Sequence, residues 1–124
     1  MLKGIKLEKI KMSYIVRTEV ELSDEMIADL LQNALYEGAS RYWISKIVVN
    51  PKDPNYDNLL KRTTHIWDED GDEHVLTADR IREGIHLFAR VYPKNLFDLL
   101  SDNDDAETAD VFLQCCIFGE VIYG

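Results

Sequence analysis

The densest group of side chains that could bind a metal ion lies in the middle of the chain, where the sequence reads DEDGDEH from Asp68 onward. Asp68, Asp70 and Asp72 have the spacing of the first three ligands of an EF-hand loop. The rest of that pattern is missing: the sharp turn lacks its glycine, and Asp79 stands where the bidentate glutamate belongs. We therefore expect a solvated β-hairpin with Asp70 and Gly71 at its tip, and no metal or other cofactor.

Two adjacent cysteines, Cys115 and Cys116, are the strongest nucleophiles of the chain. On a helix their side chains point about 100° apart, so a disulfide between them is not expected. No third cysteine exists, and both are predicted to be reduced thiols in the core. A catalytic thiol needs a nearby base and an exposed thiolate, which an apolar helix does not provide. P-loop, nucleophile-elbow, dinucleotide-binding and HExxH motifs are also absent, so we predict no catalytic residue.

An aromatic pair, Tyr42 and Trp43, falls in a predicted strand, where neighbouring side chains point to opposite faces. One of them is expected in the core and the other at the surface. With Trp67 and Tyr56, the exposed ring could form an aromatic surface for a planar ligand or a protein partner. The alternative is that these rings simply cover a small sheet.

Two polar residues interrupt the otherwise apolar segment near the end of the chain. Asp110 and Gln114 are four residues apart and therefore share one face of a helix. If they are buried, their polar atoms must be hydrogen-bonded. They could form a structural network with backbone groups or Tyr42, or they could line the polar floor of a ligand site.

The elements that position these residues follow from periodicity and capping. The run over 106–118 is apolar on nearly every side, which predicts a buried helix at the centre of the core. Ser23 and Thr77 are predicted N-caps of helices that end at Gly38 and near Tyr92. These patterns predict an α+β fold: a single domain with a small, mainly antiparallel sheet packed against about three helices. The remaining predicted elements are a short helix over 94–100 and strands over 14–22, 40–50, 63–67, 74–76 and 121–123.

Length and charge limit the classes of function. The length of 124 residues predicts a single domain, which we place at 13–124. The four lysines among the first eleven residues predict a basic N-terminal arm over 1–12. A net charge of −9 argues against nucleic-acid binding through a phosphate-neutralising surface. No run of about 18 apolar residues and no leader resembling a signal peptide occur, so we predict a cytoplasmic protein without a membrane span.

The acids are concentrated towards the C-terminus. Seven follow Lys94, and no lysine or arginine does. Asp98 and Asp102 lie in this part of the sequence, at or near a predicted loop. We therefore expect them to contribute to an acidic surface that faces a partner with a basic surface.

Three segments carry a resemblance to known proteins. They are LLQNALYEGASRYW at 30–43, LTADRIREGIHLFARVYP at 76–93 and DAETADVFLQCCIFGEVIYG at 105–124. Together they resemble small uncharacterised proteins of bacteriophages and prophages, which carry an "ALEGGS-YW" stretch and a C-terminal "DaeTADvflQcalfGevvyG" segment. Ala39 replaces the second glycine of that first stretch. The resemblance implies a phage or mobile-element origin and assigns no activity.

Two classes of function remain open at this level. The first is a non-enzymatic binding protein that acts on a host protein through its acidic or aromatic surface; an inhibitor of a bacterial defence system is one form of it. The second is a small enzyme or small-ligand-binding protein with a pocket near Tyr42, Trp43, Asp110 and Gln114. The lack of a catalytic motif favours the first class.

Overall fold

Four helices and three strands make up the part of the chain that the computed structural model describes, which is residues 13–16, 19–37, 40–50, 60–103 and 106–124. The predicted α+β class is confirmed. The predicted N-terminal arm over 1–12 lies outside the described residues. In chain order the elements are α2 (Asp24–Tyr36), β1 (Ile44–Asn50), β2 (Thr63–Asp68), β3 (Glu73–Leu76), α3 (Ala78–Val91), α4 (Pro93–Leu100) and α5 (Ala106–Phe118).

Helices α2 and α3 begin where their capping residues predict. The Ser23 hydroxyl accepts a hydrogen bond from the backbone N–H of Met26 at 3.2 Å, and the Thr77 hydroxyl accepts one from Arg80 at 3.3 Å. These bonds satisfy backbone donors that the first turn of a helix leaves unpaired. The predicted end of the first helix at Gly38 lies outside the described residues.

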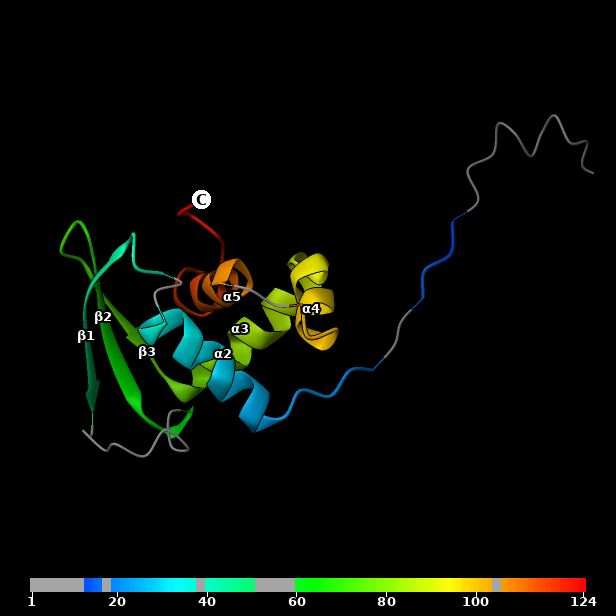
Figure 1. Ribbon diagram of the computed structural model, residues 1–124, viewed down its shortest axis with the longest axis horizontal. Coiled ribbons are helices and arrows are strands. Elements are labelled where there is room, and N and C mark those ends of the chain that lie inside the picture. Colours follow the sequence, from blue (N-terminus) through cyan, green and yellow to red (C-terminus); the bar gives the residue numbers. More distant parts are fainter. Residues whose placement is uncertain (1–12, 17–18, 38–39, 51–59, 104–105) are drawn as a thin grey trace, which may run out of the picture.

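The three strands form one antiparallel sheet in the order β1-β2-β3. Gly71 lies at the tip of the β2–β3 hairpin with φ +86°, a conformation that side chains other than glycine rarely adopt. Along β2 every second residue is buried, and these residues face the helices. The sheet therefore has one covered face and one face turned away from the helices (Figure 1).

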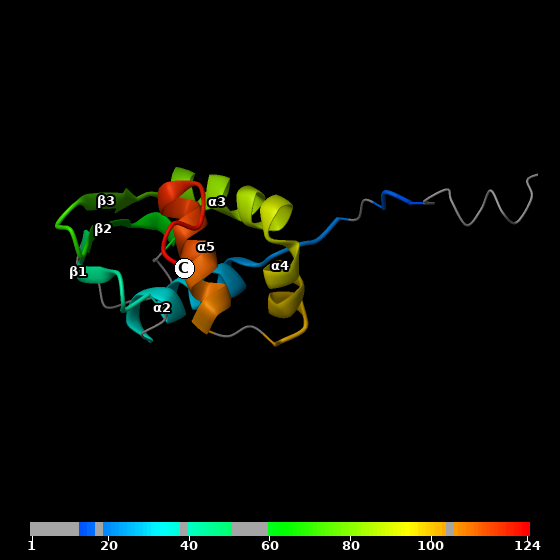
Figure 2. The same cartoon turned by 90° about the horizontal axis from the view of Figure 1, so that it is seen from above.

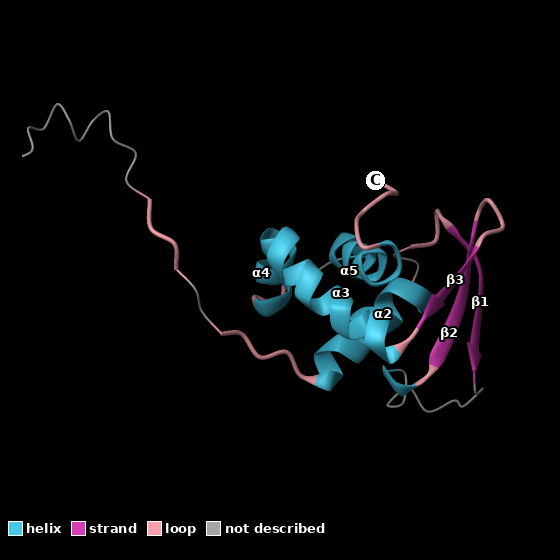
Figure 3. Cartoon of the chain, turned by 180° about the vertical axis from the view of Figure 1, so that it is seen from behind, coloured by secondary structure: helices cyan, strands magenta, loops and turns pink. Residues whose placement is uncertain are grey.

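Helix α5 lies at the centre of the core. Ten of its thirteen residues are buried, and it contacts α2, α3, α4 and β3. Seen from above, α5 lies between α2 and α3, as Figure 2 shows. Figure 3 shows the helices together on one side of the sheet, with α4 farthest from it. No described helix is long and apolar enough to cross a membrane.

Two predicted strands are wrong. The described residues of 14–22 form no strand, and the side chains of Tyr14, Ile15 and Val16 are 79–82% exposed. A strand requires a hydrogen-bonded neighbour, and alternation alone does not supply one. Residues 121–123 also form no strand, because side chains hold their backbone N–H groups instead of a neighbouring strand.

Candidate functional site

Asp110 is the centre of a buried hydrogen-bond network. The residue is 6% exposed, and its carboxylate accepts four hydrogen bonds. Oδ1 accepts from the Ser40 hydroxyl at 2.6 Å and from Trp43 Nε1 at 2.7 Å. Oδ2 accepts from the Tyr42 hydroxyl at 2.7 Å and from Gln114 Nε2 at 2.9 Å. These four donors satisfy both oxygens of a side chain that is removed from water.

Gln114 extends this network to the C-terminal residues. Its Oε1 accepts the backbone N–H groups of Ile122 and Tyr123, both at 2.9 Å. Its Nε2 donates to the carbonyl of Tyr123 at 2.9 Å, and the Tyr42 hydroxyl donates to the same carbonyl at 3.0 Å. The ring of Tyr123 stacks on that of Trp43, with 5.3 Å between ring centroids and 2° between planes. We define the Asp110 network as Ser40, Tyr42, Trp43, Asp110, Gln114, Ile122 and Tyr123.

The structure therefore brings four predicted site residues together: Tyr42, Trp43, Asp110 and Gln114. Trp43 is buried and Tyr42 is 55% exposed, which matches the expectation of one ring inside and one at the surface. Neither belongs to a strand, because the carbonyl of Ser40 accepts the N–H groups of Trp43 and Ile44 and forms a turn. Burial and the hydrogen bond to Asp110 raise the pKa of Tyr42 to about 12. The polar groups of the four residues bind one another and the C-terminal backbone, which is the arrangement of a structural network.

Trp67 belongs to a different part of the molecule. It lies half-buried on β2, where the Lys46 ammonium group sits 4.9 Å from its ring centroid and the ring of His65 stacks at 6.2 Å. Trp43, in contrast, packs against Phe118 and the C-terminal residues. The predicted aromatic surface is thus divided between two groups, and its further member, Tyr56, lies outside the described residues.

The acidic hairpin is organised by Asp68. Its Oδ1 accepts the backbone N–H groups of Asp70 at 2.9 Å and Asp72 at 3.0 Å, and Oδ2 lies 2.8 Å from His74 Nε2. The hydrogen bond to His74, followed by those from the backbone, holds the pKa of Asp68 below its ordinary value. The described residues contain no group of three His, Cys, Asp or Glu side chains that could hold a metal ion.

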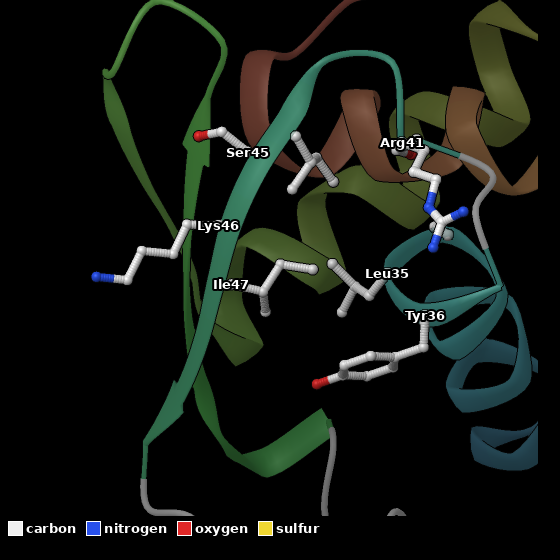
Figure 4. A pocket seen from close by; sticks show the side chains of 9 residues that line it. Leu35, Tyr36, Arg41, Ser45, Lys46 and Ile47 are labelled. Carbon is white, nitrogen blue, oxygen red and sulfur yellow. The ribbon is translucent and has the colours of Figure 1, made fainter.

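A groove of about 340 Å³ runs between the end of α2 and β1. Figure 4 shows Leu35, Tyr36 and Ile47 facing one another across it, with Arg41 at one end and Lys46 pointing away. Among the described strands β1 pairs only with β2, so its other edge is open beside the groove. We call these two features the β1 groove. Sequence reasoning missed it, because a groove depends on how two distant segments are placed.

A second surface lies on α4. Phe97 is 65% exposed and Leu100 is also exposed, while Leu96 and Leu99 of the same helix pack towards the core. Asp98 is half-buried. Asp102 is exposed and ends the helix in the left-handed conformation, with φ 58°. We define the α4 surface as Phe97, Asp98, Leu100 and Asp102. The two acids were predicted; the apolar pair could have been found from its spacing of three residues.

Comparison with known proteins assigns no function to these residues. No family model, no curated protein and no solved structure matches the chain.

Proposed function

We propose that the chain is a small acidic binding protein of phage or mobile-element origin that acts on a host protein in the cytoplasm, through its α4 surface. Inhibition of a bacterial defence system is one activity of this kind. The observation that carries the proposal is the exposure of a phenylalanine, Phe97, on the same short helix as Asp98 and five residues before the exposed Asp102. In this proposal the Asp110 network stabilises the fold, and nucleic acid is not a partner.

The chemistry of the α4 surface defines the partner. Aromatic side chains that enter a pocket of the partner contribute much of the energy of protein interfaces, while charged groups around them direct association. Phe97 can supply the aromatic contact, and Leu100 lies three residues further along the same helix, on the same face. The partner is therefore a protein with an apolar pocket surrounded by lysine or arginine side chains.

The local charge supports this choice of partner. Beyond Lys94 the sequence has seven acids and no lysine or arginine, and six of these acids are additional to the buried Asp110, so we expect a negative field in this part of the protein. A basic surface would be attracted to this region, and dissolved salt at 0.1 M would screen the attraction beyond about 10 Å.

The test is affinity capture from a bacterial host lysate, followed by kinetics with the purified captured protein. Phe97→Ser should weaken binding roughly 30-fold, as expected when about 2 kcal/mol of interface energy is lost. The matched control is Ile122→Ser, which removes an exposed apolar side chain elsewhere. Equal affinity of the two variants would rule out the α4 surface as the docking site.

The charge of the surface is tested separately. Asp98→Asn with Asp102→Asn should slow association at low salt and flatten its dependence on salt concentration, with little change in dissociation. Asn is also well suited to the left-handed conformation of Asp102, so the fold should be maintained. Asp29→Asn with Glu83→Gln removes the same charge from exposed positions on α2 and α3 and serves as the control. If both double variants reduced the association rate equally, the effect would come from net charge alone.

A further inference from the structure

Strand β1 is less well covered than its neighbour β2. Residues paired across an antiparallel sheet point to the same face, so Ile44, Ile47 and Val49 share the inner face with their partners on β2. Those partners are buried, whereas all three β1 side chains are only half-buried. Among the described elements, α2 packs closely against α5 and only flanks β1. The β1 groove is the space that this arrangement leaves beside the apolar side of the strand.

The open edge of β1 offers backbone groups next to this apolar space. In an edge strand every second residue turns its N–H and C=O groups outward, where they can pair with another strand. The register shifts between Ile44 and Lys46, so the regular part of the edge covers residues 46–50. An added strand would place alternate side chains in the groove, against Leu35 and Tyr36 of α2 (Figure 4). Both features therefore fit an extended peptide with apolar residues at every second position.

The charged groups at the groove favour an acidic occupant. Arg41 and Lys46 belong to its lining, and no aspartate or glutamate does among the described residues. Lys46 points away and its ammonium group lies over the Trp67 ring, while Arg41 is exposed at one end of the groove (Figure 4). The exposed acid that follows Tyr36, Glu37, forms no ion pair with Arg41. The guanidinium group can therefore bind a carboxylate with two parallel hydrogen bonds.

We propose that the β1 groove binds an extended acidic segment of a partner protein, which adds as a strand antiparallel to β1. The antiparallel direction continues the existing sheet and is the more stable pairing. Arg41 precedes β1 in the chain, so the C-terminal end of an antiparallel segment reaches it. An aspartate or glutamate side chain there pairs with Arg41, and the apolar side chains before it fill the space between Ile47 and Leu35. This docking site is separate from the α4 surface.

Selection from a displayed library of random ten-residue peptides tests the class of ligand. Enriched sequences should have apolar residues at every second position and an aspartate or glutamate towards the C-terminal end. A synthetic peptide of the enriched sequence, labelled with fluorescein and capped at both ends, then gives the Kd by fluorescence anisotropy. The caps remove the terminal carboxylate, so only a side chain can pair with Arg41. Enrichment of no sequence, apolar residues at helical spacing, or binding that requires a free C-terminus would overturn the proposal.

The ion pair is tested with variants of both molecules. Arg41→Ala should raise the Kd of the peptide at least about tenfold, whereas Arg90→Ala, on the exposed side of α3, should not. Both arginines are exposed, so neither change should alter the thermal unfolding temperature. Replacing the acid of the peptide by glutamine should weaken binding to the unaltered protein and have little further effect on Arg41→Ala. Independent effects of the two changes would contradict the assigned ion pair.

Strand pairing is tested on the peptide, where no change can unfold the protein. N-methylation of one set of alternate residues should abolish binding, because these N–H groups face β1, and N-methylation of the other set should be tolerated. Peptide binding should also slow hydrogen exchange of the β1 amides that point to the open edge. Equal effects of the two N-methylated sets would overturn the proposal.

Hydrogen exchange of the free protein tests the other occupants of the groove. The outward amides of β1 should exchange fast without peptide. Protection in the free monomer would show that its own chain covers the edge, and protection that rises with protein concentration would assign the edge to a second copy; either result would overturn the proposal. Phe97→Ser should leave the Kd of the peptide unchanged, and Arg41→Ala should leave capture through the α4 surface unchanged, so each proposal can fail without the other.

Discussion

Helices α5 and α4 are both rich in apolar residues, but the rest of the protein covers them to very different degrees. On α5 every residue from Thr108 to Ile117 is buried, including the polar ones. On α4, Leu99 is buried while Phe97 and Leu100 are exposed. The apolar content of a helix therefore does not decide its role; the neighbours that surround it do.

The difference has a physical origin in position. α5 contacts elements on several sides, so even Asp110 and Gln114 are removed from water and must be paired. Among the described elements, α4 packs closely against α3 and α5, and the exposed side chains of Phe97 and Leu100 leave one side of it open to solvent or to another molecule. An uncovered apolar side on a short helix is the feature that makes α4 a candidate interface.

The largest expected effect is the difference in stability when the same substitution, phenylalanine to alanine, is made on α5 and on α4. Phe112→Ala should lower the free energy of unfolding by about 3–5 kcal/mol, because it leaves a cavity beside Phe88, whose ring meets Phe112 edge-on at 5.4 Å. Phe97→Ala should change it by less than about 0.5 kcal/mol. Urea unfolding of both variants measures the two values. Similar losses in the two would mean that α4 is part of the core.

The next effect concerns the polar side of α5. Asp110→Asn should cost about 2–4 kcal/mol, because an amide NH₂ group would replace one of the two oxygens that accept four hydrogen bonds. On α4 no side chain of the described residues donates a hydrogen bond to Asp98, so Asp98→Asn should cost less than about 0.5 kcal/mol. Chemical denaturation with a circular dichroism readout distinguishes them. A neutral Asp110→Asn would show that the network does not hold the fold.

Close helix packing gives a smaller effect. Gly84 of α3 is buried against Cys116, and a Cβ at this position would lie 2.8 Å from the Cys116 Cα. Gly84→Ala should therefore force α3 and α5 apart and cost about 1–3 kcal/mol, despite the better helix propensity of alanine. Glu83→Ala, one residue earlier and exposed, is the control and should stay within about 0.5 kcal/mol. A stabilised Gly84→Ala variant would mean that the two helices pack less closely.

The smallest effect is on reactivity rather than stability. Burial raises the pKa of Cys115 to about 11 and raises that of Cys116 further. Both thiols should react slowly with a thiol reagent at pH 8 until the protein unfolds. A cysteine introduced by Leu100→Cys on α4 should react at the rate of a free thiol. Rapid native labelling of Cys115 or Cys116 would place part of α5 at the surface.

Local patterns predicted most of the fold. The caps Ser23 and Thr77, the turn at Gly71 and the all-round apolar run of α5 act within a few residues, so the sequence displays them directly. Asp110 and Gln114 share a face of a buried helix, so the sequence indicates that both need hydrogen-bond partners, with backbone groups or Tyr42 as candidates. The hydrogen bonds from Ser40 and Tyr42 to Asp110 join residues about 70 positions apart, and local patterns do not show them.

What could not be predicted depends on distant neighbours. The pattern of 14–22 alternates as a strand does, but it does not state whether a pairing edge is available in the same chain. The C-terminal Ile122 and Tyr123 have strand-forming side chains, yet Gln114 takes their backbone N–H groups. The α4 surface and the β1 groove likewise arise only when separate elements are placed side by side.

The place of α5 in the chain has a consequence for biosynthesis. Among the described elements α5 is the last to leave the ribosome, although α2, α3 and β3 all pack against it. Until Ala106–Phe118 has emerged, the nascent chain holds the apolar faces of those elements without their common partner, and Trp43 lacks the carboxylate that pairs its ring nitrogen. Translation therefore exposes the apolar faces of those elements before their common partner is available, and exposed apolar surface of this kind makes incompletely folded chains prone to aggregation.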